Sequence, residues 1–173
     1  MIKQWFSRRP PARLQVLMVC MGNICRSPMA EGVLRHKLAQ AGLADQVAVD
    51  SAGTHGFHRG AAADPRAVAQ AARRGYLIAG LKSRPVVVAD FSRFDLLLAM
   101  DHDNLATLQD RCPPAEQHRL HLLLPYANPP GQTEGVPDPY YGSVAGFDVA
   151  LDLIEPACDG VVLALQRRLA GAL

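Results

Sequence analysis

The stretch Val16-Leu-Met-Val-Cys-Met-Gly-Asn-Ile-Cys-Arg-Ser-Pro28 decides the fold of this chain. It begins inside a run over residues 14–19 that is rich in Leu and Val, as is typical of a buried strand. Ser27 is suited to cap a helix, Pro28 to stand in its first turn, and Gly42 to end it. The stretch therefore predicts a strand, a tight loop and a helix. The apolar face expected on that helix comprises Ala30, Val33, Leu34, Leu38 and Ala41.

The loop from Cys20 to Ser27 is expected where α/β sheets bind anions, at the carboxyl end of a strand and the N-terminus of a helix. A loop this short can wrap its N–H groups around one phosphate-sized dianion, while the fork of Arg26 grips two of its oxygens. The helix dipole, the inward N–H groups, Arg26 and the Ser27 hydroxyl all favour a thiolate at Cys20. Cys20 is therefore a candidate nucleophile. The alternative is that Cys20 and Cys25 are buried thiols in a turn.

A second motif, Asp138-Pro-Tyr-Tyr-Gly142, stands much later in the chain. A phosphate ester with a poor leaving group needs that group protonated, and an Asp beside an anion-binding loop can supply the proton. Taken alone, the motif is equally typical of an Asp-Pro turn with surface tyrosines. Its interpretation therefore depends on the loop at Cys20.

The segment Cys20-Met-Gly-Asn-Ile-Cys-Arg-Ser-Pro28 resembles the signature of the low-molecular-weight protein tyrosine phosphatases nearly residue for residue. The resemblance runs from about Val16 to the C-terminus, and three further motifs carry it: Asp50-Ser-Ala-Gly-Thr54, Ala63-Asp-Pro-Arg-Ala67 and Asp138-Pro-Tyr-Tyr-Gly142. It implies a protein-tyrosine-phosphatase with a phosphocysteine intermediate on Cys20, with Arg26 binding phosphate and Asp138 acting as general acid and then base. It implies no cofactor and no metal.

The resemblance also implies which residues surround the substrate. The expected substrate-binding residues are Met21, Gly22, Asn23, Ile24, Cys25, Ser27, Phe57, Tyr140 and Tyr141. Ser51 is expected to support the loop through a bond to Asn23, and Phe57 to form an aromatic wall, the alternative being a small satellite of the core. His55 and His58 could contact an anionic substrate at the rim or simply be solvated. Leu81 stands where the family often has a His, so the supporting hydrogen bonds of that His are not expected here.

Composition restricts the remaining possibilities. With 173 residues, 49% of them hydrophobic and 20% charged, the chain can build one compact α/β domain. A net charge of +2 does not demand a nucleic-acid partner, and no apolar run is long enough for a membrane span. The four cysteines do not form the dense framework of a small secreted protein, which favours the reducing cytoplasm.

Residues 1–13 are expected to be a flexible basic extension that precedes a single phosphatase-like domain over residues 14–173. Lys3, Arg8, Arg9 and Arg13 give the extension a charge of +4 without an acidic residue, so the remainder carries −2. Pro10 and Pro11 argue against a helix leading into the first strand. Trp5 and Phe6 offer an alternative in which this segment touches a membrane or a partner.

The other elements follow from periodicity and from helix start and stop signals. They are a strand over 47–51, a loop over 51–63, a helix over 65–74, a strand over 94–100, a helix over 101–111, a strand over 120–124, an exposed loop over 125–135 and a helix from 146 onward. Asp64 and Asp101 are interpreted as helix caps, which is simpler than a catalytic role for Asp101. A kink or one-turn break is expected at Pro156.

Strand–helix–strand connections predict a four-stranded parallel sheet with right-handed crossovers and helices on both faces. The family resemblance implies the strand order 2-1-3-4. It also implies a phosphotyrosine-containing protein as substrate, and tyrosine kinases of exopolysaccharide assembly are targets of bacterial members. The sequence does not indicate the physiological substrate or the oligomeric state.

Three alternatives remain open. A thioredoxin-coupled arsenate reductase shares the loop but needs two further cysteines close together, and Cys112 and Cys158 are far apart in sequence. A protein arginine phosphatase has Thr where this chain has Ile24. A redox-regulated phosphotyrosine-binding module would use a reversible disulfide between Cys20 and Cys25. A zinc site at these two cysteines lacks a second ligand pair.

Overall fold

The computed structural model describes residues 11–129 and 135–171. Most of the expected basic extension, up to residue 10, thus lies outside the described residues. Arg13, at the end of that segment, is bound to the domain. Its backbone N–H donates to the Gln46 carbonyl at 2.9 Å, and its side chain donates to Gln46 Oε1 and to the Leu169 carbonyl.

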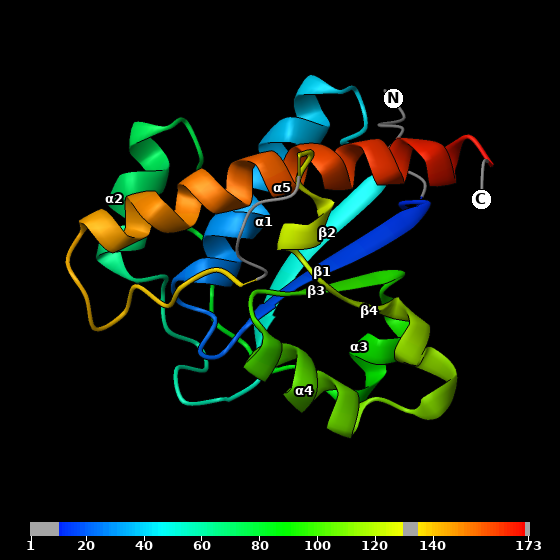
Figure 1. Cartoon of the computed structure of the whole chain (residues 1–173), viewed down its shortest axis with the longest axis horizontal. Coiled ribbons are helices and arrows are strands. Elements are labelled where there is room, and N and C mark those ends of the chain that lie inside the picture. Colours follow the sequence, from blue (N-terminus) through cyan, green and yellow to red (C-terminus); the bar gives the residue numbers. More distant parts are fainter. Residues whose placement is uncertain (1–10, 130–134, 172–173) are drawn as a thin grey trace, which may run out of the picture.

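A parallel sheet of four strands forms the centre of the structure (Figure 1). The strands are β1 (Leu14–Cys20), β2 (Val47–Gly53), β3 (Leu96–Ala99) and β4 (Leu120–Leu122). Their spatial order is β2-β1-β3-β4, which confirms the predicted fold. Strand β1 pairs with β2 along its whole length, from Leu14 opposite Val47 to Cys20 opposite Gly53, and with β3 on its other side. Cys20 therefore lies at the carboxyl end of β1, a central strand of the sheet.

Helices cover both faces of the sheet (Figure 1). One layer contains α1 (Arg26–Gln40), α2 (Pro65–Arg73) and α5 (Ala145–Leu169), and the other contains α3 (Val88–Arg93) and α4 (His102–Arg111). Two short 3-10 helices complete the fold, η1 (Pro114–Arg119) and η2 (Leu124–Tyr126). None of the helices in the described ranges is both long enough and apolar enough to cross a bilayer.

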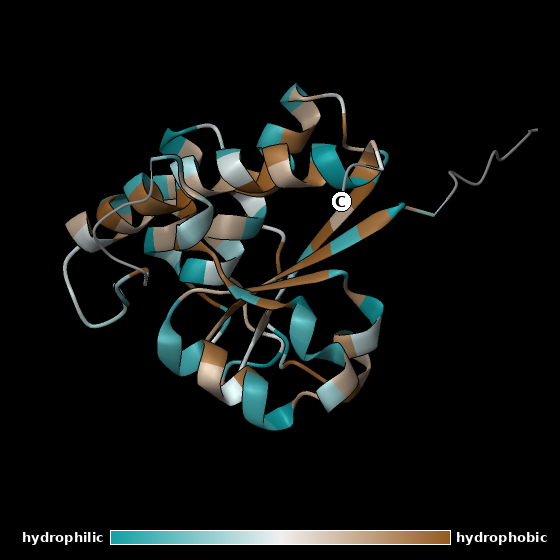
Figure 2. Ribbon diagram, turned by 45° about the vertical axis from the view of Figure 1, so that its right-hand side comes forward, coloured by the Kyte–Doolittle hydropathy of each residue, from teal (hydrophilic) through white to brown (hydrophobic). Residues whose placement is uncertain are grey.

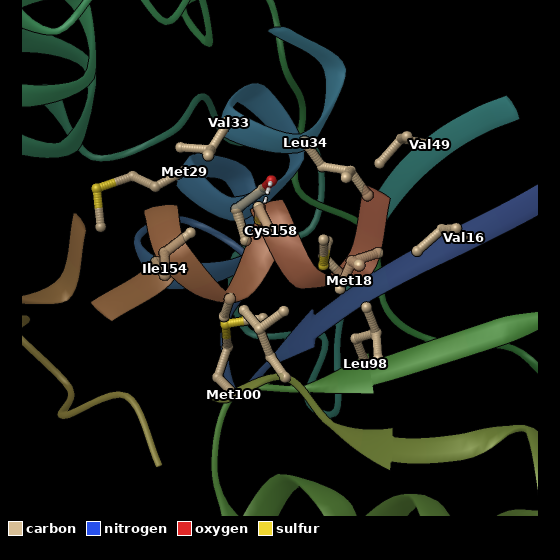
Figure 3. Close-up of a cluster of buried hydrophobic side chains, with 14 of the residues drawn as sticks. Val16, Met18, Met29, Val33, Leu34, Val49, Leu98, Met100, Ile154 and Cys158 are labelled. Atoms are coloured by element: carbon tan, nitrogen blue, oxygen red, sulfur yellow. Dashed lines mark hydrogen bonds between the residues drawn. The ribbon is translucent and has the colours of Figure 1, made fainter. Parts of the chain in front are cut away.

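Alternate side chains of β1 enter two separate cores. Val16 and Met18 join the larger core, which α1 and α5 cover from above, and Figure 3 shows them beside residues of both helices. Leu17 and Val19 join a smaller core on the opposite face with Phe91 of α3 and other side chains. Because both faces of the strand are buried from Val16 to Cys20, this part of its sequence is an unbroken apolar run rather than an alternating one. Figure 2 shows the strands as mostly hydrophobic and the helices as mixed.

The start of α1 differs from the prediction. The helix begins at Arg26, Cys25 is its N-cap residue, and no side chain makes the capping bond. Ser27 is not the cap, because its hydroxyl lies in the first turn and contacts Cys20 Sγ instead. At the other end, Ala41 is exposed and is not on the buried face, since it is already the C-cap residue. Gly42, with φ of +71°, ends the helix as predicted.

Several other boundaries also differ. Strand β2 continues to Gly53, two residues further than expected, and β3 and β4 are shorter than expected. Residues 88–93 form α3, which was not predicted because this helix is only six residues long. The segment after β4 is not simply an exposed loop. It begins with η2, whose Tyr126 is half-buried against the larger core.

The last helix, α5, continues through Pro156 without the predicted break. Pro156 is exposed, so the carbonyl that lacks a helical N–H partner can bond to water. Gly160 lies on the side that packs against η2. A Cβ atom at Gly160 would lie 1.7 Å from the Tyr126 carbonyl oxygen, so only Gly permits this approach of helix and loop.

Gly160→Ala should therefore destabilise the protein. Ala gains about 1 kcal/mol of helix propensity over Gly, but separating α5 from η2 should cost more, with a net loss of about 2 kcal/mol in the free energy of unfolding. Urea unfolding followed by circular dichroism measures this loss. Gly80→Ala is the matched control, because a Cβ at Gly80 meets open space. Equal stability of the two variants would contradict the packing described.

Candidate active site

The Cys20 side chain lies at the bottom of the loop between β1 and α1. The residue is 3% exposed. Its Sγ accepts a hydrogen bond from the backbone N–H of Asn23 at 3.3 Å and lies 3.0 Å from Ser27 Oγ. The N-terminus of α1 also points at this loop, so its dipole favours negative charge here. Two hydrogen-bonding groups and a helix N-terminus thus lie around the sulfur.

Asn23 organises the loop through its backbone and its side chain. Its φ of 55° lies in the left-handed region, which Asn tolerates better than most residues. Its amide nitrogen donates to Ser27 Oγ and to Ser51 Oγ, each at 2.9 Å, and its amide oxygen accepts from the Arg84 N–H at 3.0 Å. The expected bond between Ser51 and Asn23 is confirmed.

A buried carboxylate, Glu31, sets the direction of these hydrogen bonds. The Ser51 hydroxyl donates to Glu31 Oε2 at 2.5 Å, so Ser51 must accept from Asn23. Asn23 donates in turn to Ser27, which leaves the Ser27 proton for Cys20 Sγ or for the more distant Ala52 carbonyl at 3.4 Å. The chain of bonds thus offers a donor to the sulfur.

The surroundings of Glu31 were not predicted from the sequence. Burial raises the pKa of Glu31, and the ion pair with Arg35 at 2.6 Å opposes this shift. An acidic residue inside the otherwise apolar turn of α1 was the signal that could have identified Glu31.

Leu81, the residue in place of the usual His of the family, is partly buried and packs against the larger core.

Arg26 is buried, at 3% side-chain exposure, and bonds to three groups. Its Nη1 donates to Asp101 Oδ2 at 2.5 Å and to the Val136 carbonyl at 3.0 Å, and its Nη2 donates to Asp138 Oδ2 at 3.1 Å. Burial opposes the charge of Arg26, but Cys20, Asp101 and Asp138 together outweigh this effect and raise its pKa. Arg26 therefore stays positively charged beside the sulfur.

Asp101 has two functions at once. Its Oδ1 accepts from the Asn104 N–H at 2.7 Å, which confirms that it caps α4, and its Oδ2 holds Arg26. The second function was not predicted, although Asp101 follows β3 and Cys20 ends the neighbouring β1. Because parallel strands end at the same edge of a sheet, their adjacency was the available signal.

Asp138 lies beside Arg26, as the resemblance implied. The Val136 N–H donates to the Met100 carbonyl at 2.8 Å and so joins this segment to the end of β3. The Asp138 side chain is 44% exposed, and its Oδ1 accepts from the Tyr140 N–H at 3.1 Å. One carboxylate oxygen thus contacts Arg26 while the other contacts its own loop.

These groups open into a cavity of about 320 Å³. Its lining residues are Cys20, Met21, Gly22, Ile24, Cys25, Arg26, Phe57, His58, Asp138, Tyr140 and Tyr141. Asn23 and Ser27, which were also expected to bind substrate, are not among these lining residues; both are buried, and their side chains are bonded to each other. His58 was considered at the sequence level only as a rim residue or a solvated one, and it lines the cavity.

Aromatic rings form the walls of the cavity. Phe57 is 78% exposed and stacks on His55 with ring centroids 5.2 Å apart, so it is not a satellite of the core. Tyr140 and Tyr141 meet edge to face with centroids 4.8 Å apart. A flat ring can enter between these walls while a phosphate group reaches the loop below.

Comparison with known proteins matches residues 15–170 to the family model "Low molecular weight phosphotyrosine protein phosphatase". The chain belongs to this family. A low molecular weight protein-tyrosine-phosphatase of Streptomyces coelicolor is 42% identical over 162 residues, which cover 91% of this chain and 96% of that protein.

Solved structures agree with this assignment. A protein tyrosine phosphatase from Entamoeba histolytica, with Hepes in its active site, is 40% identical and aligns with a TM-score of 0.86 over 89% of this chain and 97% of its own. The YfkJ protein of Bacillus subtilis is 33% identical, with a TM-score of 0.85 over 91% and 97% of the two chains. The likeness therefore extends over nearly the whole phosphatase fold.

The remaining cysteines of this phosphatase-family chain are separate from one another. Cys112 belongs to the smaller core and Cys158 to the larger one, on opposite faces of the sheet. They do not form the neighbouring pair that the arsenate reductase alternative requires. Within the parts of the chain that the structure describes, no group of three His, Cys, Asp or Glu side chains is arranged to hold a metal ion.

The Arg26–Asp101 pair should stabilise the fold measurably. Asp101→Asn preserves a cap for α4 but leaves the buried Arg26 without one partner, so we expect a loss of about 2 kcal/mol in the free energy of unfolding. Asp101→Ala should lose about 1 kcal/mol more, because the cap is lost as well. Urea unfolding measures both. Asp103→Asn, which removes an exposed charge in the same turn, is the control and should cost less than about 1 kcal/mol. If Asp101→Asn and Asp103→Asn had the same free energy of unfolding, the Arg26–Asp101 pair would not contribute to stability.

Alkylation should distinguish Cys20 from the other three thiols. Burial raises the pKa of Cys25 to about 12, and burial also raises the pKa of Cys112 and of Cys158. These three thiols should stay protonated at neutral pH, whereas Cys20 has a hydrogen-bonded sulfur at the cavity.

We expect iodoacetamide to label Cys20 first, and inorganic phosphate to slow that labelling. Peptide mass spectrometry over time measures the rate at each cysteine. The Cys20→Ser variant is the control, and it should remain unlabelled over the same period. Labelling of Cys25 or Cys112 as fast as Cys20 would contradict this arrangement.

Proposed function

We propose that this protein hydrolyses phosphotyrosine in proteins through a phosphocysteine intermediate on Cys20. The observation that carries the proposal is the convergence of Cys20, Arg26 and Asp138 on one cavity with aromatic walls. Membership of the low molecular weight phosphatase family supports it.

In the first step, the Cys20 thiolate attacks phosphorus in line with the bond to the phenolic oxygen. The S–P bond forms as the P–O bond breaks, and Arg26 and the loop N–H groups stabilise the charge on the equatorial oxygens. Asp138 gives its proton to the leaving phenolate as general acid. The Tyr residue of the substrate leaves, and the phosphoryl group stays on the sulfur.

In the second step, water attacks the phosphorus of phosphocysteine. Asp138, now a carboxylate, accepts a proton from that water as general base. The S–P bond breaks, inorganic phosphate leaves, and the Cys20 thiolate is regenerated. Each turnover thus consumes one water and restores the proton to Asp138.

The walls of the cavity favour a phenolic ester over an alkyl one. The rings of Phe57, Tyr140 and Tyr141 can hold a flat ring by stacking and edge contacts. A phosphoserine side chain is too short to fill this space, so it would lose those contacts.

The proposed setting is the reducing cytoplasm, and all four cysteines are free thiols in the structure. The proposed partner is a phosphotyrosine-containing protein, with a bacterial tyrosine kinase as one candidate. A reversible disulfide between Cys20 and Cys25 would protect the nucleophile from irreversible oxidation.

Two substitutions test the mechanism. Cys20→Ser should abolish hydrolysis of an aryl phosphate, because a hydroxyl is a far weaker nucleophile here than a thiolate. Asp138→Asn should slow hydrolysis by about 10²–10⁴-fold, the usual contribution of a general acid. Steady-state kinetics without added metal measure both. Normal turnover by the Cys20→Ser variant would falsify the mechanism.

The substrate class requires a separate comparison. We expect hydrolysis of a phosphotyrosine peptide and of an aryl phosphate, and little hydrolysis of a phosphoserine or phosphoarginine peptide of matched sequence. A thioredoxin-coupled assay with arsenate covers the alternative reductase. Turnover of arsenate, with none of the phosphotyrosine peptide, would overturn the proposal.

A further inference from the structure

Arg66 makes an unusual number of contacts for a residue that does not line the cavity. It stands in the first turn of α2, after the long loop that follows β2. Its side chain bonds to Asp64 and to two backbone carbonyls far away in the chain, and its guanidinium also lies over two aromatic rings. Arg66 has no role in the proposed hydrolysis steps.

One end of this contact network reaches the loop from Cys20 to Ser27, called the phosphate-binding loop below. The Asp64 N–H donates to the Ile24 carbonyl at 2.7 Å, which joins the start of α2 to that loop. The Asp64 carboxylate then caps α2 through the Arg66 N–H at 2.8 Å. It also accepts from Arg66 Nε at 3.0 Å and from Nη2 at 2.8 Å, so the two side chains are held in a planar fork.

The other end reaches residues 135–142, called the Asp138 loop below. Arg66 Nη2 donates to the Tyr140 carbonyl at 2.9 Å, and Nη1 donates to the Gly142 carbonyl at 3.3 Å. The guanidinium lies 4.8 Å from the ring centroid of Phe147 and 5.9 Å from that of Tyr140. Asp138 is bonded to the same piece of backbone, because its Oδ1 accepts from the Tyr140 N–H.

We propose that Arg66 is a positioning residue that joins the Asp138 loop to the phosphate-binding loop through Asp64. The Asp64–Arg66 pair spans the gap between the Ile24 carbonyl and the Tyr140 carbonyl, so it sets where Asp138 lies relative to Cys20. Its planar fork suits this task better than an ammonium group, which cannot reach Asp64 and two carbonyls together. Arg66 touches neither the substrate nor the reacting atoms.

The proposal rests on the proposed function and has a specific kinetic consequence. Of the two steps that use Asp138, only the first, in which the leaving group is protonated, contributes to kcat/KM, because formation of phosphocysteine precedes the attack by water. Phenyl phosphate needs that proton, because phenolate is a poor leaving group, whereas 2,4-dinitrophenolate leaves without help. Loss of Arg66 should therefore make kcat/KM depend more steeply on the leaving group. A loss of folded protein would lower kcat/KM by the same factor for both esters.

The test compares Arg66→Ala with wild type on phenyl phosphate and 2,4-dinitrophenyl phosphate. We expect kcat/KM to fall by about 10–10²-fold on phenyl phosphate and by less than about threefold on the dinitrophenyl ester. Arg66→Lys guards against a variant that fails to fold, and it should show the same pattern in weaker form. Arg73→Ala, on the same helix with its side chain bonded to Gln70, is the matched control and should leave both values unchanged.

A second arm repeats Arg66→Ala in an Asp138→Asn background. If Arg66 acts through Asp138, the second substitution should add less than about threefold on phenyl phosphate, because the acid is already lost. Equal losses in both backgrounds, or equal losses on both esters, would overturn the proposal. The Asp138→Asn variant alone tests the proposed function, so failure of the acid role is distinguishable from failure of Arg66.

Discussion

The hydrogen bonds around the Cys20 sulfur are the constraint on which the rest of the structure depends. They require a backbone turn with Asn23 at φ of 55°, a conformation that costs most non-glycine residues about 1–2 kcal/mol. The three side-chain bonds of Asn23 offset this cost, because a buried amide without partners would cost about 1–3 kcal/mol. The loop conformation and the polar groups beneath it therefore stabilise one another.

Helix α1 carries two buried charged side chains close to this loop, and both are paired. Glu31 has Ser51 and Arg35, and Arg26 has Asp101, the Val136 carbonyl and Asp138. An unpaired ion at either position would lose several kcal/mol of hydration without compensation. Pairing within the fold thus lets a cation lie next to the sulfur, where a phosphate dianion would be bound.

Features encoded by local pattern could be predicted from the residues themselves, whereas contacts between distant residues were predicted only where the family resemblance implied them, as for Asn23 and Ser51. The strand before Cys20, the caps at Asp64 and Asp101, and the stop at Gly42 each rest on a few neighbouring residues. The predicted start of α1 lies too far along the chain, because Ser27 was interpreted as the N-cap residue. In the structure its hydroxyl contacts Cys20 Sγ and does not cap the helix. The partners of the Arg26 side chain, and the two carbonyls that Arg66 binds in addition to Asp64, come from segments more than seventy residues away in sequence.

The Asp138 loop shows why such distant contacts matter for the proposed chemistry. Residues 135–139 form no helix or strand, so no backbone ladder holds the carboxylate in place. Val136 is held by the Met100 carbonyl, just after β3, and by Arg26. The Tyr140 carbonyl is held by Arg66 of α2. In the proposed mechanism Arg26 binds the phosphate, so its contact with Asp138 would change when substrate enters. An attachment that does not involve the phosphate is then needed to keep the acid in place, and Arg66 is placed to supply it.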